Sequence, residues 1–427
     1  MNRKFTSYPV NNFTAVKTKM LNWANQFNIF CLLDNNQYNF LDPQFECLLA
    51  AGSVKTLQPI PGNAFEELQD FMHEQKDWVF GHLGYDLKNE IENLSSQNFD
   101  GIQFPDIFFF VPEIVLILKT NTLDIGIING DSEVIYQNIL STSEDRKIKK
   151  SIATIKNRFS KEEYLEAVAQ IQQHILRGDC YELNFCQEFY AEHCEIDPLD
   201  IYVKLSQLSP NPFAGFYKLN DKFLLCSSPE RYLKKVGDKI FSQPIKGTSK
   251  RDLQNANEDE RNKKNLSINK KEISENVMIV DLVRNDLSKV CIEGSVKVDE
   301  LFGLYTFPQV HQMISTVSGT INRDASFASI LKATFPMGSM TGAPKKSVMQ
   351  LIEQYEKTKR GLFSGAIGYI TPENDFDFNV VIRSLLYNST NKYVSMQAGS
   401  AITFYSDAEK EYEECLLKIE AMKKVLE

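Results

Sequence analysis

The sequence predicts a globular protein of mixed helices and short strands. Hydrophobic residues make up 43% and charged residues 24% of the 427 residues, which excludes disordered and fibrous classes. Aromatic-rich runs between turn residues, as at 27–33 and 78–81, indicate strands. Apolar residues at helical spacing behind capping residues, most clearly at 160–178, indicate helices. Together these patterns predict that strands and helices both contribute to the core.

The charge balance and the apolar runs narrow the class of protein further. The formal net charge of −9 argues against a nucleic-acid binder but allows an anionic substrate in a locally basic site. The first ten residues have no apolar signal-peptide region, and the most apolar run, 107–118, is broken by Pro112 and Glu113. That run is much shorter than the ~20 residues of a membrane span, so we expect buried sheet. Eight cysteines without C-x-x-C spacing predict free thiols, and the protein is expected to be cytoplasmic.

A polar, strongly charged stretch at 141–160 separates two regions with different sequence patterns: short aromatic-rich strand candidates before it, and a well-marked helix directly after it. We therefore predict an N-terminal region over 1–145 and a second, catalytic region over 150–427. The second region opens with a helix that Ser160 and Glu163 cap and that Gly178 ends. Its predicted strands are 181–185, 213–218, 223–226, 310–317, 365–370 and 379–385; a mobile surface loop is expected over 249–269, and a final helix, with a Ser406–Glu409 capping box, from about 407.

Two predicted helices each carry two glutamates three residues apart. Residues at i and i+3 lie on one helix face, so each pair directs two carboxylates the same way. Two such faces across a cleft would suit Mg²⁺, which prefers oxygen ligands. The alternative is a solvated helix face in each case, and neither helix has a histidine to complete an E-x-x-H iron or manganese site. The four glutamates are Glu272, Glu275, Glu411 and Glu414.

Glycine-rich turns and one lysine form a second group of candidates. The turns at 335–345 and 398–401 could place backbone N–H groups against an anion, although glycine turns are common. Lys246 lies between an apolar residue and a turn glycine, and Glu230 precedes it by sixteen positions. Burial lowers the pKa of a lysine and makes the amine a usable nucleophile or base. For Lys246 the alternative is an ordinary surface lysine. His311 lies in a predicted strand, where a lone histidine usually has a structural role.

Seven segments, taken together, resemble the chorismate-utilising enzymes in order and spacing. The resemblance covers about residues 150–425, and before that it rests only on LLD at 32–34 and GHLGYD at 81–86. It implies an α+β fold of two large antiparallel β-sheets packed as a sandwich, with helices outside and a cleft for chorismate and Mg²⁺. The seven segments are SPERYL, QPIKGT, EISENVMIVDLVRNDL, FPMGSMTGAPK, GLFSGAIGY, NVVIRSL and EYEEC-x-x-K.

The resemblance also implies roles for individual residues. The four glutamates become the Mg²⁺ ligands, and Tyr369 and Arg383 the groups that bind the enolpyruvyl carboxylate, for which a planar guanidinium is suited. His311 corresponds to a family histidine near the substrate ring. The positions that contact substrate or orient the metal ligands are Gly247, Thr248, Ser339, Gly399 and Lys418.

Lys246 indicates which reaction the resemblance implies. Anthranilate-forming relatives have alanine at this position, whereas the members that aminate chorismate at C4 have lysine. In the latter, the amine is thought to attack ring C2 while an acid equivalent to Glu230 protonates the departing C4 hydroxyl, and ammonia then enters at C4. The implied product is 4-amino-4-deoxychorismate, toward 4-aminobenzoate and folate. The alternatives are an anthranilate-forming enzyme and a non-catalytic chorismate-binding paralogue.

Three positions depart from the family pattern. Glu182 stands where aminating relatives usually have glutamine and where isochorismate-forming and salicylate-forming relatives have a water-activating lysine, so that branch is disfavoured. Ala401 replaces a common glycine. The run at 32–36 differs from the tryptophan-binding pattern of some relatives, so no tryptophan feedback is expected. No G-x-C-x-G glutaminase motif occurs, so a separate glutamine amidotransferase subunit is expected to supply ammonia in a heterodimer.

Overall fold

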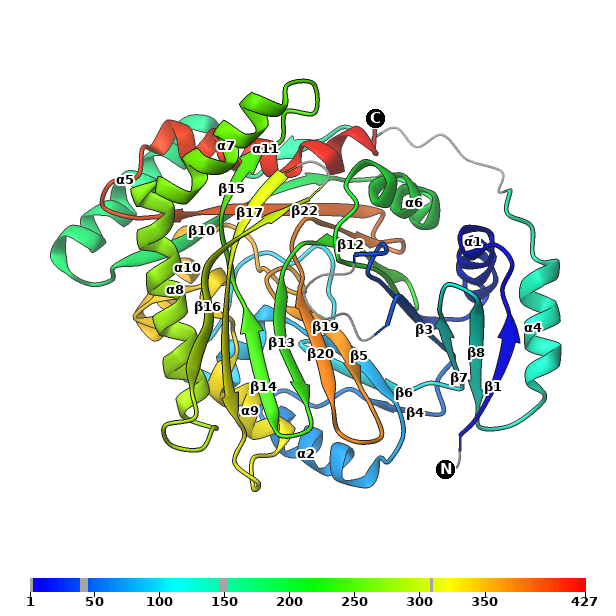
Figure 1. The fold of residues 1–427 in the computed structure, drawn as a ribbon. Helices are drawn as coiled ribbons and strands as arrows, with labels where there is room; N and C mark the ends of the chain where they lie inside the picture. The colour runs from blue at the N-terminus through cyan, green and yellow to red at the C-terminus, as the bar shows by residue number, and fades with distance from the viewer. Residues whose placement is uncertain (1–2, 39–44, 146–152, 308–309) are drawn as a thin grey trace.

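Two large antiparallel β-sheets with helices outside form the molecule, as the sequence predicted (Figure 1). The computed structural model describes residues 3–38, 45–145, 153–307 and 310–427. One apolar cluster contains residues of both sheets together with α2, α8 and α9. A second cluster lies between the larger sheet and helices α1, α5, α6, α10 and α11. The core therefore has two layers, one on each face of the larger sheet.

Among the described residues the larger sheet has twelve strands, and the long strand β10 pairs with β22 along nearly its whole length. A short additional strand, β9 (Lys156–Asn157), pairs with the far end of β10. In spatial order the other strands are β1 (Lys4–Pro9), β8 (Thr122–Ile127), β7 (Ile114–Leu118), β3 (Cys47–Ala51), β2 (Ile29–Asp34), β11 (Phe213–Leu219), β12 (Lys222–Ser228), β21 (Ser384–Asn388), β22 (Tyr393–Ile402), β10 (Glu182–Ala191) and β18 (Gly342–Ala343).

The smaller sheet, in the part of the chain that the structure describes, has ten strands and contains the strand on which Lys246 lies. Strand β16 (Lys297–Thr306) pairs with β17 beside the main path. In spatial order the other strands are β15 (Ile245–Lys250), β17 (Val310–Thr320), β14 (Lys239–Gln243), β13 (Arg231–Val236), β20 (Phe376–Val380), β19 (Ala366–Ile370), β5 (Val79–Leu83), β6 (Ile107–Val111) and β4 (Lys55–Leu57).

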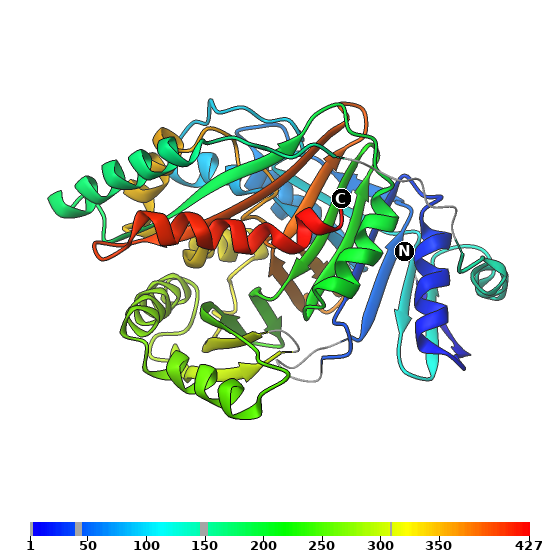
Figure 2. The same ribbon diagram turned by 90° about the horizontal axis from the view of Figure 1, so that it is seen from above.

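Helices cover the outer faces of the sheets, and α11 runs along β22 beside α5 (Figure 2). Ser160 and Glu163 form the predicted capping box of α5, and Gly178 ends that helix at φ 85°. The helices are α1 (Phe13–Ala24), α2 (Ala64–Glu74), α3 (Lys88–Glu92), α4 (Ser132–Ser141), α5 (Lys161–Arg177), α6 (Pro198–Leu208), α7 (Ala256–Ile268), α8 (Lys270–Ser288), α9 (Phe327–Thr334), α10 (Lys345–Tyr355) and α11 (Ala408–Lys424), with 3₁₀ turns η1 (Tyr85–Leu87) and η2 (Gly338–Met340).

Strands from both parts of the sequence contribute to each sheet. Strand β2 pairs with β11 in the larger sheet, and β5 pairs with β19 in the smaller one. In Figure 1 the blue strands of the N-terminal part lie beside green and orange strands of the second part. The predicted boundary between 145 and 150 lies largely outside the described residues and stays a prediction. Each sheet contains strands from both sides of this boundary.

Two local expectations were wrong and one was confirmed. The tract at 249–269 contains the end of β15 and helix α7, which Asn255 caps, instead of a loop. Helix α11 is capped by Asp407, which accepts from two backbone N–H groups, so the Ser406–Glu409 capping box does not form. The apolar run at 107–118 is buried sheet as predicted, divided at Pro112 and Glu113 between the two sheets. Within the described residues, no helix has the length and apolar character to cross a bilayer.

Candidate active site

Lys246 lies in an irregularity of strand β15, where the pairing with β17 shifts by one residue between Ile245 and Thr248. Gly247 makes this shift possible, because its φ of 94° is unfavourable for any residue with a side chain. A Cβ at Gly247 would also lie 3.2 Å from a carboxylate oxygen of Glu272. Such bulges redirect a side chain out of the regular ladder. Here the bulge directs Lys246 toward the carboxylates described next.

The Lys246 side chain is 12% exposed, and its ammonium lies among carboxylates. Its Nζ donates a 3.2 Å hydrogen bond to Glu182 Oε1 and lies 3.9 Å from Glu275 Oε2. Burial by itself lowers the pKa of Lys246, but the Glu182 and Glu275 carboxylates raise it above its usual value overall. The sequence-based expectation of a lowered lysine pKa is therefore wrong for the protein without ligands. Before Lys246 can act as a nucleophile, its proton must leave.

Glu182 is the first residue of β10, opposite Ala343 of β18, and is 2% exposed. The sequence marked this glutamate only as a departure from the family pattern. The structure shows that it is the hydrogen-bond partner of Lys246. Glutamine at this position would keep an oxygen acceptor and remove the negative charge. Glu182 therefore belongs to the candidate site, although spacing alone did not include it.

Glu230 lies between β12 and β13 and is 5% exposed. Burial raises its pKa to about 7, although the nearby Ser339 hydroxyl and the Lys246 ammonium favour the ionised form. Its backbone is held by Ser228, whose hydroxyl accepts from Glu230 N at 3.2 Å, and by Val380, whose N–H donates to Glu230 O at 3.0 Å. A carboxyl group with a pKa near neutrality can give up a proton at physiological pH, which suits an acid catalyst.

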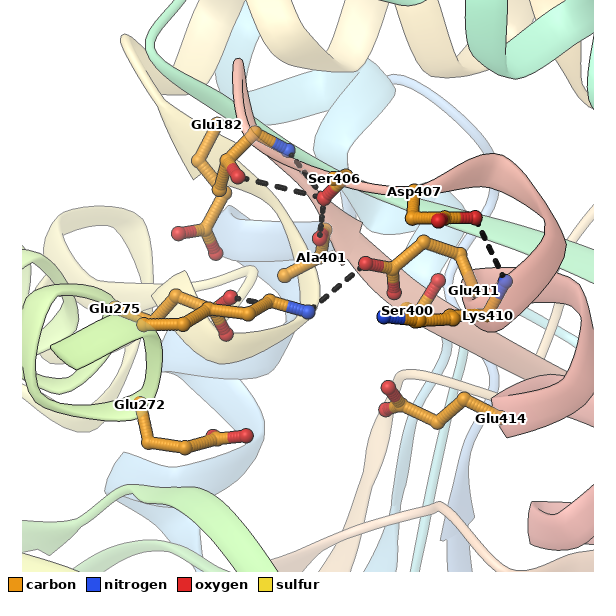
Figure 3. Close-up of polar contacts among 12 residues, drawn as sticks. Glu182, Glu272, Glu275, Ser400, Ala401, Ser406, Asp407, Lys410, Glu411 and Glu414 are labelled. Atoms are coloured by element: carbon orange, nitrogen blue, oxygen red, sulfur yellow. Dashed lines mark hydrogen bonds and ion pairs between the residues drawn. The ribbon is translucent and has the colours of Figure 1, made fainter. Parts of the chain in front are cut away.

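The four predicted metal-binding glutamates face one another across two helices. Glu272 and Glu275 project from α8, and Glu411 and Glu414 from α11, with their carboxylates directed into the same space (Figure 3). Lys271 Nζ lies between the two sides, 2.8 Å from Glu411 Oε1 and 3.7 Å from Glu275 Oε1. Sequence reasoning missed this lysine, although its i, i+4 spacing to Glu275 was visible. A positive charge thus already bridges the two helices.

Two atoms of this set have no hydrogen-bond partner. Glu275 Oε1 and Glu411 Oε2 are buried without a donor among the described residues. Buried carboxylate oxygens are stabilised by a cation, so the donor set is chemically suited to a hard metal ion. No three carboxylate, imidazole or thiol groups of the described chain converge to metal-binding distance by themselves. Mg²⁺ usually completes its shell with water and substrate oxygens, so four converging protein ligands are not required.

Arg383, Gly399 and Lys418 lie beside Glu414. Lys418 Nζ is 2.6 Å from Glu414 Oε1 and donates to the Gly399 carbonyl at 2.6 Å. Arg383 has a φ of 53° and donates one 3.4 Å hydrogen bond to the carbonyl oxygen of Lys418. Gly399 is packed so closely that a Cβ would lie 2.4 Å from Cys186 Sγ. The structure therefore brings two cationic groups and a tightly packed backbone segment to the edge of the carboxylate set.

Tyr369 lies in apolar surroundings, away from the carboxylate set. Tyr369 packs against Phe45, Trp78 and Phe80 and lines a cavity between the sheets together with Arg231, among other residues. None of the other predicted site residues lines that cavity. The proposed contact of Tyr369 with substrate stays a prediction that the described contacts do not support.

His311, on β17, is held by neighbours on both ring nitrogens. Its Nε2 lies 3.0 Å from Asp259 of α7, and its Nδ1 lies 3.0 Å from the Thr306 hydroxyl. These contacts fix the ring between β17 and α7. Thr248 lies opposite Gln312 on the neighbouring strand, one position from His311. The proposed catalytic role of His311 also stays a prediction.

With the fold and site described, comparison with known proteins identifies the family. The family model for chorismate binding enzymes matches residues 31–424, and the chain belongs to that family. A protein named aminodeoxychorismate synthase component 1 from Escherichia coli K12 is 32% identical over 354 residues, 82% of this chain and 77% of that protein. A rice protein named probable aminodeoxychorismate synthase, chloroplastic, is 34% identical over 85% of this chain. This chain spans only 46% of the rice protein's length.

Solved structures agree with this assignment. Anthranilate synthase component I from Streptococcus pneumoniae TIGR4 superposes with a TM-score of 0.76 at 26% identity, over 88% of this chain and 91% of that one. The menaquinone-specific isochorismate synthase MenF from Escherichia coli gives a TM-score of 0.76 at 15% identity, over 100% and 95% of the two chains. At that low identity the MenF likeness shows the fold alone. The predicted two-sheet fold is thereby confirmed.

Proposed function

We propose that this chain aminates chorismate at C4 and forms 4-amino-4-deoxychorismate, on the route to 4-aminobenzoate and folate. The observation that carries the proposal is the Lys246 amine, which a β-bulge directs toward the Glu272, Glu275, Glu411 and Glu414 carboxylates, near Glu230. The names of the E. coli and rice relatives support the same reaction. Ammonia is proposed to come from a separate glutamine amidotransferase subunit, in a heterodimer.

The proposed reaction consists of two displacements on the ring. Lys246 first passes its proton to the Glu182 carboxylate, 3.2 Å away. The neutral amine then forms a bond to C2 while the C4–O bond breaks, and Glu230 donates the proton with which the hydroxyl leaves as water. Ammonia then forms a bond to C4 while the bond between C2 and Lys246 breaks. The new ammonium group returns one proton to Glu230, and the lysine is regenerated. The balance is chorismate plus ammonia to aminodeoxychorismate plus water.

Mg²⁺ is the proposed cofactor, and Glu272, Glu275, Glu411 and Glu414 are the residues that would hold it. Glu275 and Glu411 each have a buried oxygen that makes no hydrogen bond among the described residues, which supports this choice. When bound there, a divalent cation would neutralise the carboxylates and attract the ring carboxylate of the substrate. Arg383 and Lys418 supply positive charge on the same side, where a second substrate carboxylate could bind. Their backbone partners keep these side chains close to Glu414.

Product analysis tests the proposal. The protein is incubated with chorismate, Mg²⁺ and ammonium, and the products are separated and identified by mass and ultraviolet spectrum. Aminodeoxychorismate is expected from the wild type, and none above background from Lys246→Ala. The matched control is Lys250→Ala, which changes a lysine at the other end of the same strand. Formation of aminodeoxychorismate by Lys246→Ala at the wild-type rate would exclude the covalent role.

An anthranilate-forming activity is the second candidate. The superposition with the S. pneumoniae anthranilate synthase component I favours it, as does a Synechocystis relative named anthranilate synthase component I-like protein, 33% identical over 355 residues. Direct attack of ammonia on the ring needs no lysine nucleophile. Anthranilate as the product of the same incubation, unaffected by Lys246→Ala, would establish this candidate in place of the first.

A further inference from the structure

Along part of one edge of β10, beside the candidate site, no neighbouring strand is found among the described residues. Strand β18 pairs with Glu182 and Leu183, and β9 pairs with Phe189 and Tyr190. Among the described residues no strand pairs with this edge between those two segments. The intervening residues are buried, so their backbone N–H and C=O groups need other partners.

A buried ion pair supplies those partners. Arg360 Nη2 donates to the Asn184 carbonyl at 2.7 Å, and Glu356 Oε1 accepts from Cys186 N at 2.9 Å. The carbonyl of one residue and the N–H two positions later point to the same edge of a strand, so the pair satisfies the groups that a neighbouring strand would have bonded. Arg360 and Glu356 are joined at 2.6 and 3.0 Å, and their side chains are 1% and 3% exposed.

The same guanidinium also holds the turn that carries Ser339. Arg360 Nη1 donates to the Met340 carbonyl at 2.6 Å, at the end of η2. The neighbouring Thr341 carbonyl accepts from Asn184 N at 2.8 Å. Arg360 thereby connects the strand that begins with Glu182 to the turn that contains Ser339. These two residues lie beside Lys246 and Glu230, respectively.

We infer that the Arg360–Glu356 pair is a positioning device that sets Glu182 and Ser339 against the reacting groups Lys246 and Glu230. The inference rests on the proposed amination of chorismate. Neither member touches Lys246 in the described contacts, so both are positioning residues. A buried ion pair adds little net stability, because desolvation of both charges offsets their attraction. The attraction between the two charges is therefore expected to add little to the stability of the fold, whereas their hydrogen bonds to buried backbone groups contribute both to stability and to the geometry of the site.

The double variant R360M/E356M tests this inference. It removes both charges together and keeps apolar volume, so no single buried charge is left unpaired. We expect the variant to fold with a lowered thermal midpoint, because the buried backbone groups of Asn184, Cys186 and Met340 lose their partners. Its kcat for aminodeoxychorismate formation should fall about 10²-fold, as for a displacement of about 1 Å at a reacting centre. The KM for chorismate should change far less, because Arg383 and Lys418 lie on other elements.

The matched control is R158M/E188M. Arg158 and Glu188 form another ion pair on the same edge of β10, at 2.8 Å, two residues beyond Cys186. We expect this variant to retain kcat. An unchanged kcat in folded R360M/E356M, or an equal loss of kcat in both variants, would overturn the inference. If R360M/E356M does not fold, Glu356→Gln replaces it. The glutamine oxygen can still accept from Cys186 N while its hold on Arg360 weakens, and a smaller kcat loss at unchanged KM is then expected.

Amide hydrogen exchange separates this inference from the proposed function. The exchange rate of Cys186 N–H reports the partner supplied by Glu356 without any turnover. Faster exchange at Cys186 and the adjoining residues of β10 in R360M/E356M, but not in R158M/E188M, supports the positioning role. Unchanged exchange there refutes it. A wild-type protein that forms no aminodeoxychorismate would refute the proposed function while the exchange result still decides whether the pair holds this edge.

Discussion

Lys246 shows how surroundings determine the chemistry of a single residue. Burial alone would favour the neutral amine, but Glu182 and Glu275 lie within 3.2 and 3.9 Å of its Nζ and raise its pKa. Glu230 responds to burial in the opposite sense, since its pKa rises to about 7 because the charged form loses solvation. An ammonium ion and a protonated carboxyl group can thus coexist near neutral pH. For the proposed reaction, about half of the Glu230 carboxyl groups carry the proton to be donated at pH 7, a far larger fraction than for an ordinary glutamate.

The raised pKa of Glu230 predicts a pH-dependent stability difference. In the unfolded chain the pKa is near 4.5, and in the folded protein it is about 7. The wild type therefore loses stability as pH rises through this interval, because the unfolded state ionises more readily. The Glu230→Gln variant does not lose stability in this way, because glutamine does not ionise. Urea unfolding should show similar free energies of unfolding for both proteins near pH 4, and a variant more stable by up to about 3 kcal/mol at pH 8.

Aminodeoxychorismate formation by Glu230→Gln and a control variant complete this test. Glu230→Gln should lose aminodeoxychorismate formation at every pH, because an amide cannot donate the proton. Glu373→Gln, in the turn between β19 and β20, is the control for a glutamate-to-glutamine change at an exposed position. A stability difference between wild type and Glu230→Gln that is the same at pH 4 and pH 8 would contradict the raised pKa.

At the scale of elements, the approach of α8 and α11 creates the carboxylate set. Each helix presents two glutamates on one face, and Lys271 bridges the helices through Glu411 and Glu275. Both helices are anchored by apolar residues that pack on the sheets, so the carboxylates are held in place by the core. The pairs thus converge because the two helices pack against the same framework.

Glu411→Gln should weaken the binding of Mg²⁺. Glu411 is 2% exposed and one of its oxygens has no hydrogen-bond partner, so removal of its charge takes away a group suited to the cation. We expect the dissociation constant for Mg²⁺, measured by isothermal titration calorimetry with chorismate present, to rise at least about tenfold, in line with changes near metal sites. Glu413→Gln, exposed on the same helix, is the control. Equal Mg²⁺ affinity in both variants would argue against Glu411 as a ligand.

At the scale of the whole molecule, the two sheets unite both parts of the chain. Strand β2 completes the larger sheet beside β11, and β5 completes the smaller sheet beside β19. Removal of the N-terminal part would expose the edges of β11 and β19 together with the apolar surface between the sheets. The candidate site residues lie in the second part, but the sheets that position them contain strands from both parts of the chain.

A fragment of residues 153–427 is therefore expected not to fold alone. It should aggregate or lack a cooperative thermal transition, as measured by size-exclusion chromatography and circular dichroism. Co-expression with a fragment of residues 1–145 should restore a soluble complex, because the paired strands can re-form across the cut. A monomeric 153–427 fragment with cooperative unfolding would show that the second part has an independent core.

Much of the fold was predictable, because its signals are local. The α5 capping box, its C-terminal Gly178 and the buried strands at 107–118 follow from patterns within a few residues. The tract at 249–269 was assigned wrongly because its composition is polar. Helix α7 forms there with an Asn255 cap, and it packs through Leu266, its one fully buried residue. A single buried leucine leaves too weak an apolar pattern to predict a helix.

The sequence by itself determined the family resemblance, the two-sheet fold class and the set of candidate site residues, because residue types and their spacing along the chain carry that information. Only the tertiary structure decided that Glu182 holds Lys246, that Lys271 bridges α8 and α11, and that Arg360 and Glu356 complete the edge of β10. Each of these contacts joins residues from different elements, such as Lys271 and Glu411, 140 positions apart. Local periodicity cannot specify such pairs, because they depend on how the sheets and helices pack.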